Sequence, residues 1–173
     1  DTKSCFDMNA MFNKQQNLKT LILGPKFDTS KVVDMAYMFS SCGLEELDFS
    51  GFKTANCENF NSMFSCSKFK VLDLSSFSFA SCKDMSCMFN SCEDLCAILA
   101  DDNTDWNSST RSSDFMFDNC TSLAGSAGTK CSYDHIDGSY AHTDSAANPG
   151  YLYYGNKVIK PSSSGPVLSY NGE

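Results

Sequence analysis

The sequence predicts an α/β solenoid, a right-handed coil with a short parallel β-sheet on one face, short helices on the other and an irregular C-terminal cap. The first observation is a Met-Phe pair that recurs along the chain, with its phenylalanines at Phe12, Phe39, Phe64, Phe89 and Phe117. The intervals between these positions are nearly constant, and a period of this length is typical of repeats that stack as successive coils. A single copy cannot bury its apolar face alone, so neighbouring copies must cover one another.

The clearest copy runs from Asp28 to Phe52, and the segments on either side of it are weaker versions of the same phrase. The first copy begins at Asp1, and a degraded fifth copy starts near Trp106. Beyond Leu123 the composition shifts to Gly, Ser, Ala and Tyr, which is typical of irregular structure. We therefore expect a repeat region over 1–124, a C-terminal cap over 125–160 and a linker or tail over 161–173.

One short strand is expected in each copy. In the clearest copy, Leu44, Leu47 and Phe49 alternate with polar residues, the pattern of a strand with one buried face. The matching strands should pair in parallel. The equivalent apolar residues of the other copies are Leu18, Leu21 and Leu23, then Phe69, Leu72 and Leu74, then Leu95, Ile98 and Ala100.

A short helix is expected on the opposite side of each coil. Between Lys31 and Phe39 the apolar residues are spaced by three and four, which is one face of a helix. Thr29 or Ser30 stands where a side chain would cap the first turn.

Charge and hydropathy exclude several classes of function. The 173 residues include 13 basic and 21 acidic side chains, a formal charge of −8 that would repel nucleic acid and anionic membranes. No apolar run approaches the roughly 20 residues of a membrane span, so no membrane insertion is expected. Because the sequence opens inside a repeat, we interpret it as a fragment or a processed chain.

The ten cysteines allow two interpretations. Several share aligned positions, one of which holds Val32 in the second copy, so these thiols could serve as small buried hydrophobic groups. Alternatively, neighbouring coils could be joined by disulfides, because equivalent Cα atoms in stacked strands lie about 5 Å apart. Three cysteines outside the aligned columns are also disulfide candidates. The full candidate set is Cys57, Cys82, Cys66, Cys92, Cys87, Cys96 and Cys131.

The repeat phrase resembles that of a known family. The pattern LxxLDxSxF followed by DTSxVxDMxxMFxxC is similar to the BspA-like leucine-rich repeat family of surface proteins, and the tail from Ser126 to Tyr151 resembles that family's usual ending. The resemblance implies a leucine-rich-repeat-like coil in a secreted or cell-surface protein. It also implies a role in adhesion, because some family members are taken to bind host proteins or other cells.

The sequence provides little support for catalysis. Its two histidines, His135 and His142, lie among carboxylates near the C-terminus, but their spacing matches no zinc or nucleophile-base motif. We expect no enzyme activity, no catalytic residue, no cofactor and no metal. A Ca²⁺ site is a weaker alternative, because Asp48 and Asp73 share one strand position in adjacent copies and Asp101 and Asp102 follow in the next.

The exposed face of the sheet is the first place to expect a partner. Its outward residues should be Ile22, Glu46, Asp48, Val71, Asp73 and Leu99. We expect a protein or glycoprotein ligand on another cell or on the matrix, and an extracellular or cell-surface location. The alternative is a structural subunit that self-associates by stacking into a fibre or surface layer. Asn107 and Asn119 lie in N-glycosylation motifs.

Overall fold

The computed structural model describes residues 1–101, 104–106, 108–154, 157–162 and 165–170. Five strands and one short 3₁₀-helix are found in these residues, and turns and loops make up most of the rest. The elements are β1 (Val71–Asp73), β2 (Ala97–Ala100), η1 (Gly138–Tyr140), β3 (Leu152–Tyr154), β4 (Lys157–Ser162) and β5 (Gly165–Tyr170).

The predicted fold class, an α/β solenoid with helices along one face, is wrong. The described residues contain no α-helix, and the parallel sheet has three strands, in the order β1-β2-β3. The segment from Lys31 to Phe39, where we expected a helix, consists mainly of turns. The segments containing Leu21 and Leu47, where we expected strands, carry no strand.

Backbone conformation explains why the helical spacing did not produce a helix. Tyr37 and Ser41 have φ angles of +58° and +53°, a left-handed conformation that interrupts a right-handed helix. Alternate amides bond within the turn, as when the N–H of Met38 donates to the carbonyl of Met35 at 3.2 Å. The amides between them donate to the next copy, as when the N–H of Met35 donates to the carbonyl of Asn59 at 2.9 Å. The turns therefore still direct both methionines inward, where they are fully buried.

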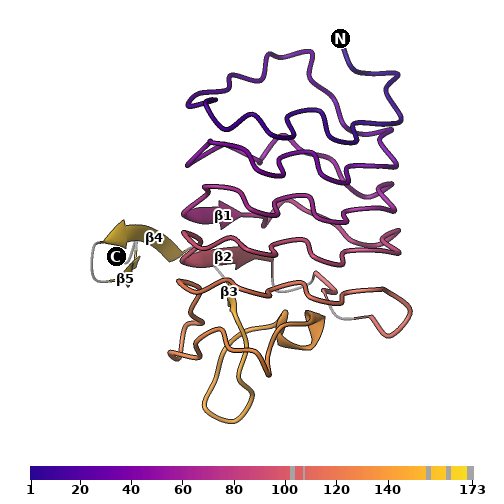
Figure 1. Ribbon diagram of the computed structural model, residues 1–173. Coiled ribbons are helices and arrows are strands. Elements are labelled where there is room, and N and C mark those ends of the chain that lie inside the picture. The colour runs from indigo at the N-terminus through magenta and orange to yellow at the C-terminus, as the bar shows by residue number, and fades with distance from the viewer. Residues whose placement is uncertain (102–103, 107, 155–156, 163–164, 171–173) are drawn as a thin grey trace.

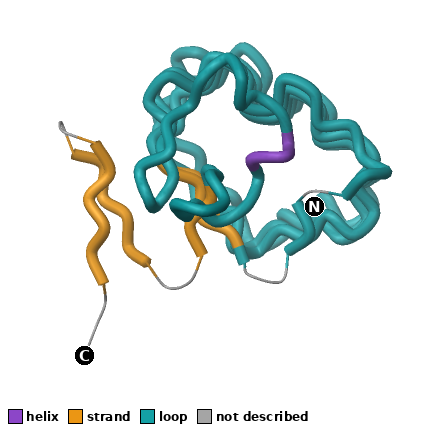
Figure 2. Tube along the Cα trace, turned by 90° about the horizontal axis from the view of Figure 1, so that it is seen from below, coloured by secondary structure: helices purple, strands orange, loops and turns teal. Residues whose placement is uncertain are grey.

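Successive copies lie on one another as turn-rich layers (Figure 1). Seen along the stack, the layers nearly superpose (Figure 2). Isolated parallel bridges connect equivalent positions of adjacent copies from Asp7 to Ser112. We number the layers by the copies that form them, as layer 1 (1–27), layer 2 (28–52), layer 3 (53–77) and layer 4 (78–101).

A continuous row of aromatic rings forms the centre of the core. The recurring phenylalanines stack from one layer to the next, as expected from their period, with centroids 5.3, 6.0, 5.8 and 5.6 Å apart. Four of the five are fully buried. Offset stacking of this kind adds to the free energy gained by burying the rings. The row consists of Phe12, Phe39, Phe64, Phe89 and Phe117.

The parallel sheet is completed by the C-terminal region. β1 pairs with β2 through Leu72 and Ile98, and β2 pairs with β3 through Ile98 and Leu152. The third strand therefore comes from a segment much further along the chain than β2, in the expected cap, rather than from the fifth copy. All four residues of β2 are buried, because Ile98 and Ala100 face the main core, whereas Ala97 and Leu99 pack with Tyr153 of β3 on the other face.

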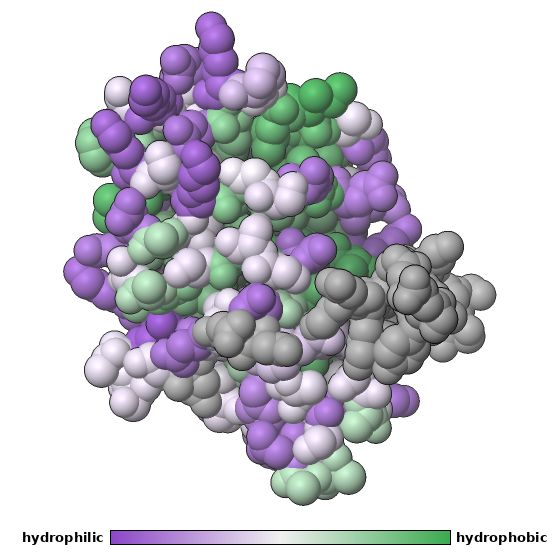
Figure 3. Space-filling model, turned by 180° about the vertical axis from the view of Figure 1, so that it is seen from behind, coloured by the Kyte–Doolittle hydropathy of each residue, from purple (hydrophilic) through white to green (hydrophobic). Residues whose placement is uncertain are grey.

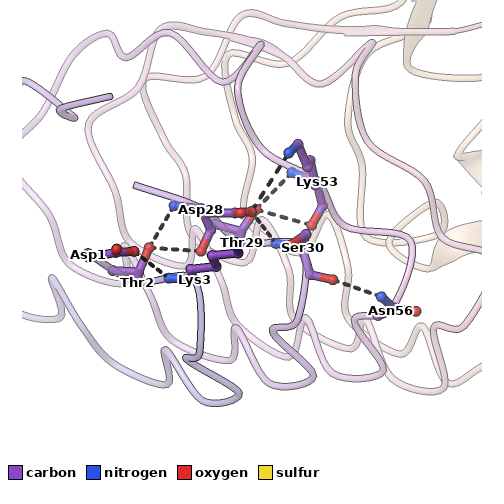
Figure 4. A network of polar contacts seen from close by, with 8 residues as sticks. All are labelled: Asp1, Thr2, Lys3, Asp28, Thr29, Ser30, Lys53 and Asn56. Atoms are coloured by element: carbon purple, nitrogen blue, oxygen red, sulfur yellow. Dashed lines mark hydrogen bonds and ion pairs between the residues drawn. The ribbon is translucent and has the colours of Figure 1, made fainter. Parts of the chain in front are cut away.

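Threonine hydroxyls of the first three layers connect each of them to the layer that follows, so layers 1 to 4 are joined at this edge. The Thr29 hydroxyl accepts from the N–H of Lys53 at 2.7 Å and donates to the carbonyl of the same residue at 3.1 Å (Figure 4). Thr2 makes the same pair of bonds with Asp28, and Thr54 makes it with Ser78. These threonines do not cap helices, so the expected capping role is wrong for Thr29. Each hydroxyl instead satisfies two backbone groups of the following layer.

Replacing Thr29 by Val should lower the free energy of unfolding by about 1 to 3 kcal/mol. Thr29 is fully buried, so the substitution leaves the N–H and carbonyl of Lys53 without partners. Urea denaturation monitored by circular dichroism measures the loss. Thr20→Val is the control, because Thr20 is exposed. Equal stability of the two variants would show that these hydroxyl bonds contribute nothing.

The cap closes the C-terminal end of the core. Tyr151 is fully buried with its ring centroid 5.1 Å from that of Phe117, and its hydroxyl donates to the carbonyl of His135 at 2.9 Å. The buried carboxylate of Asp144 accepts from the N–H groups of Ala127, Thr129 and Gly150 at 2.8, 2.9 and 3.2 Å. The carboxylate of Asp144 therefore joins the turn over 127–129 to Gly150.

β4 and β5 pair antiparallel, from Lys157 opposite Tyr170 to Ser162 opposite Gly165. This hairpin lies to one side of the layers (Figures 1 and 2). Part of the segment that we expected to be a linker or tail is therefore strand.

Candidate functional site

The outward face of the first three layers carries most of the predicted binding residues. Ile22 is 87% exposed, and Glu46, Asp48 and Asp73 are exposed as well. The first three of these line an open groove of about 820 Å³ that runs across layers 1 and 2. Figure 3 shows hydrophobic surface gathered toward the N-terminal end on the strand side of the molecule. An apolar surface bordered by carboxylates is thus available for contact.

The exposed face is shorter in the structure than the sequence predicted, because Leu99 is only 8% exposed. Leu99 belongs to a small second cluster with Ala97 and Tyr153, and the half-buried Val71 packs against it. The pairing of β2 with β3 places Tyr153 beside Leu99. The choice of Leu99 as an exposed binding residue is therefore wrong, and Val71 contributes only in part.

Two of the exposed carboxylates have a structural role. Asp48 accepts from the N–H of Ser50 at 2.9 Å, and Asp73 accepts from the N–H of Ser75 at 3.1 Å. For Asp48, hydrogen bonds from the side chain and the backbone of Ser50 lower the carboxyl pKa below its usual value. Turns fixed by a carboxylate in this way are common where Asp begins a turn. Glu46 makes no such bond among the described residues, so of these three carboxylates it is the one that fixes no turn.

No metal centre is found in the part of the chain that the structure describes. It contains no group of three or more His, Cys, Asp or Glu side chains arranged to hold an ion. Asp102, one residue of the suggested Ca²⁺ site, lies outside the described residues. The His135 ring stacks on Tyr140 at 4.2 Å, and His142 Nδ1 lies 3.0 Å from the carbonyl oxygen of Thr143. Both imidazoles therefore pack within the cap.

All ten cysteines lie within the described residues, and all ten are free thiols. Of the disulfide candidates, Cys57, Cys82 and Cys92 are buried and Cys66 is exposed. The remaining three, Cys87, Cys96 and Cys131, are half-buried. The alternative interpretation, in which thiols fill apolar positions, agrees with the buried positions of Cys57 and Cys92.

The buried thiols also donate hydrogen bonds along the aromatic row. Cys92 Sγ lies 3.0 Å from the carbonyl oxygen of Phe64, and Cys120 Sγ lies 2.9 Å from that of Phe89. Burial raises the pKa of Cys57 to about 12 and that of Cys92 to about 11. A thiol with so high a pKa stays protonated at neutral pH and is a poor nucleophile.

Of the two predicted glycosylation sites, Asn119 is exposed and its amide lies 3.4 Å from a carboxylate oxygen of Glu93. Asn107 lies outside the described residues. Within the part of the chain that is described, no helix combines the length and apolar character that crossing a bilayer requires.

Sequence reasoning missed Asp144, and it gave Thr29 the role of a helix cap instead of its role between layers. The recurrence of Thr2, Thr29 and Thr54 at one position of the repeat was a signal for a shared role between layers. Asp144 occurs once, so no internal comparison could single it out.

The layers and the exposed face define a class, a repeat protein of short stacked layers that offers a preformed surface. The chain belongs to the family described as Mycoplasma protein of unknown function, DUF285, whose model matches residues 1–106 and 73–134. These matches cover the layers and the start of the cap. No curated protein and no solved structure matches the chain.

Proposed function

We propose that this protein is a non-enzymatic, extracellular or cell-surface module that binds a protein or glycoprotein through the exposed face of layers 1 to 3. The observation that carries the proposal is the 87% exposed Ile22 on a groove that Glu46 and Asp48 also line. Large apolar side chains that solvent can reach, bordered by polar residues, are typical of interaction surfaces. The resemblance of the repeat phrase to BspA-like surface proteins supports the same proposal.

Carboxylates decide which partners this face favours. Glu46, Asp48 and Asp73 are exposed there, and the chain as a whole carries a formal charge of −8. A basic surface of the partner would be attracted, and an acidic one repelled. We therefore expect a ligand that makes an apolar contact with Ile22 and has lysine or arginine side chains around that contact.

The test is a double substitution, Ile22→Ser with Glu46→Lys. Neither side chain makes a hydrogen bond within the described residues, so the layers should stay intact, whereas changing Asp48 or Asp73 would also remove a turn contact. Binding is measured on an array of purified extracellular-matrix glycoproteins. We expect the double variant to bind at least about tenfold more weakly, a loss of about 1.4 kcal/mol.

The matched control is Tyr133→Ser with Asp134→Lys. Tyr133 is 85% exposed in the cap and Asp134 is exposed beside it, so hydropathy and charge change in the same way at a remote place. The control should bind like the unmodified protein. Loss of binding in both variants, or in neither, would contradict a site on this face.

The second candidate is a structural subunit that stacks end to end. One observation favours it, because Phe6 and Met11 in layer 1 are 61% and 47% exposed. The covered opposite end, where Tyr151 lies on Phe117, works against it. Light scattering over a range of concentrations tests this candidate, and a mass that rises with concentration would favour stacking over the face-binding proposal.

A further inference from the structure

A row of thiols runs through the core beside the aromatic rings, and the cap supplies its last member. Cys120 Sγ donates to the carbonyl of Phe89 at 2.9 Å, as the buried thiol of the fourth copy does to the copy before it. Cys131 Sγ, which belongs to the cap, makes the same bond with the carbonyl of Phe117 at 3.1 Å. Cys131 therefore takes the place that the cysteine of a further copy would occupy, directly after Cys120 in the row.

The layers set the separation of these two cysteines. The rings of Phe89 and Phe117 lie 5.6 Å apart, and the two thiols are bound to the carbonyls of these residues, so they are about one strand spacing, roughly 5 Å, apart. The N–H of Cys131 donates to the carbonyl of Leu123 at 3.2 Å, which fixes the cap segment beside the fifth copy. Disulfides join residues whose Cα atoms are about 4.4 to 6.8 Å apart. Rotation of the two side chains could therefore bring the sulfurs into bonding distance.

The two thiols also share one small open cavity, but they differ in exposure. Cys120 and Cys131 both line this cavity of about 80 Å³, together with Tyr133 and Ile136. Its volume is well below the roughly 300 Å³ of a site for a small organic molecule. Cys131 is half-buried, whereas Cys120 is fully buried. An oxidant therefore meets Cys131 first, and Cys120 reacts through Cys131.

We propose that Cys120 and Cys131 form a disulfide when the protein meets a small disulfide oxidant such as oxidised glutathione, and that this bond fastens the cap to the fifth copy. The Cys131 thiolate attacks one sulfur of the oxidant, and a glutathione thiolate leaves. The Cys120 thiolate then attacks Cys131 Sγ, and the second glutathione leaves. The two protein thiols lose two protons and two electrons in total, and the oxidant gains them. The proposal is independent of the proposed function, because it does not involve the outward face around Glu46.

Access favours this pair over the other neighbours in the row. Cys92 and Cys120 are also one layer apart, but both are buried, so an oxidant reaches neither in the folded protein. Burial raises the pKa of both Cys120 and Cys131, which makes the exchange slow because the thiolate is the reactive form. The second step is intramolecular, so Cys120 competes for Cys131 Sγ at a high effective concentration.

The test incubates the complete folded protein with oxidised glutathione for hours at about pH 8.5, near the pKa of a free thiol. We expect peptide mapping without reduction to find Cys120 linked to Cys131, with no glutathione on either. The bond closes a short loop in the unfolded chain, so the midpoint of thermal unfolding should rise by about 5 to 10 °C. Added reductant should reverse both changes.

Two variants separate the steps of the reaction. Cys120→Ser should stop after the first step, keep one glutathione on Cys131 and show no rise in the midpoint. Serine fits this position of the row, because Ser67 occupies it in the third copy, where its hydroxyl lies 3.6 Å from Cys92 Sγ. Cys96→Ser removes a half-buried thiol outside the row, and this control should form the bond as the unmodified protein does.

Three results would overturn the proposal. They are the absence of the Cys120–Cys131 link after oxidation, a glutathione that stays on Cys131 of the unmodified protein, and pairing of either cysteine with a different partner. A link that forms but leaves the midpoint of unfolding unchanged would show that the bond does not fasten the cap.

Discussion

Replacing Phe64 by Ala should remove about 3 to 5 kcal/mol from the free energy of unfolding. Phe64 is fully buried in the middle of the aromatic row, 6.0 Å from the ring of Phe39 and 5.8 Å from that of Phe89. It also meets the edge of the Phe49 ring at 5.5 Å. Removing the ring leaves a cavity between three layers. Because the free energy of unfolding of a native protein is only about 5 to 15 kcal/mol, a large part of the stability would be lost.

Urea denaturation monitored by circular dichroism measures this effect. Phe115→Ala is the matched control, because Phe115 is 54% exposed and makes no ring contact among the described residues. It should change stability by less than about 0.5 kcal/mol. A Phe64→Ala variant within about 1 kcal/mol of the unmodified protein would be incompatible with a row of rings that stabilises the stack.

The second large effect is expected at Asp144. Burial raises the pKa of this carboxyl, but hydrogen bonds from the Thr129 hydroxyl and from the N–H groups of Thr129, Gly150 and Ala127 outweigh burial and lower it below its usual value. The Asp144→Asn substitution removes the charge and one acceptor oxygen. We expect a loss of about 2 to 3 kcal/mol at pH 7, because hydrogen bonds to a charged group are the stronger kind.

The pH dependence follows from the direction of this shift. A carboxyl whose pKa is lower in the folded than in the unfolded state stabilises the fold fully above its unfolded pKa of about 3.9, and loses that contribution as the pH falls through its folded pKa. The stability difference between the unmodified protein and Asp144→Asn should therefore shrink below about pH 4. Thermal unfolding from pH 2.5 to 7 measures this difference. Asp114→Asn, at an exposed position, should show the same pH dependence of stability as the unmodified protein. If the stability difference between Asp144→Asn and the unmodified protein stayed constant over this pH range, protonation of Asp144 would not be linked to unfolding.

The stacking of equivalent positions could be predicted from the sequence because it depends on period alone. Phe39, Phe64 and Phe89 recur at equal intervals, and any layer of constant length places such residues above one another. The inward orientation of Met35 and Met38 could be predicted for the same reason, and both are fully buried. These predictions required no knowledge of the backbone.

The backbone itself could not be predicted in the same way. Spacing by three and four is compatible with a helix and equally with successive turns in which Tyr37 and Ser41 adopt positive φ. Nothing in the local sequence shows that alternate amides will donate to the next layer. The participation of Leu152 in the sheet depends on a contact between segments far apart in the chain, which repeat spacing does not reveal. The exposed position of Ile22 followed from alternation, whereas the burial of Leu99 depends on that added strand.

The chain contains a single tryptophan, Trp106, which is 2% exposed and lies 4.5 Å from the ring of Phe79 and 6.4 Å from that of Phe89. Its ultraviolet emission is therefore a local optical probe for the C-terminal half of the stack, and the first two layers are silent in that signal. If neighbouring layers melt at different temperatures, the fluorescence transition and the transition seen by circular dichroism will not coincide. One native chromophore thus makes it possible to ask, without any label, whether the molecule melts as one cooperative unit.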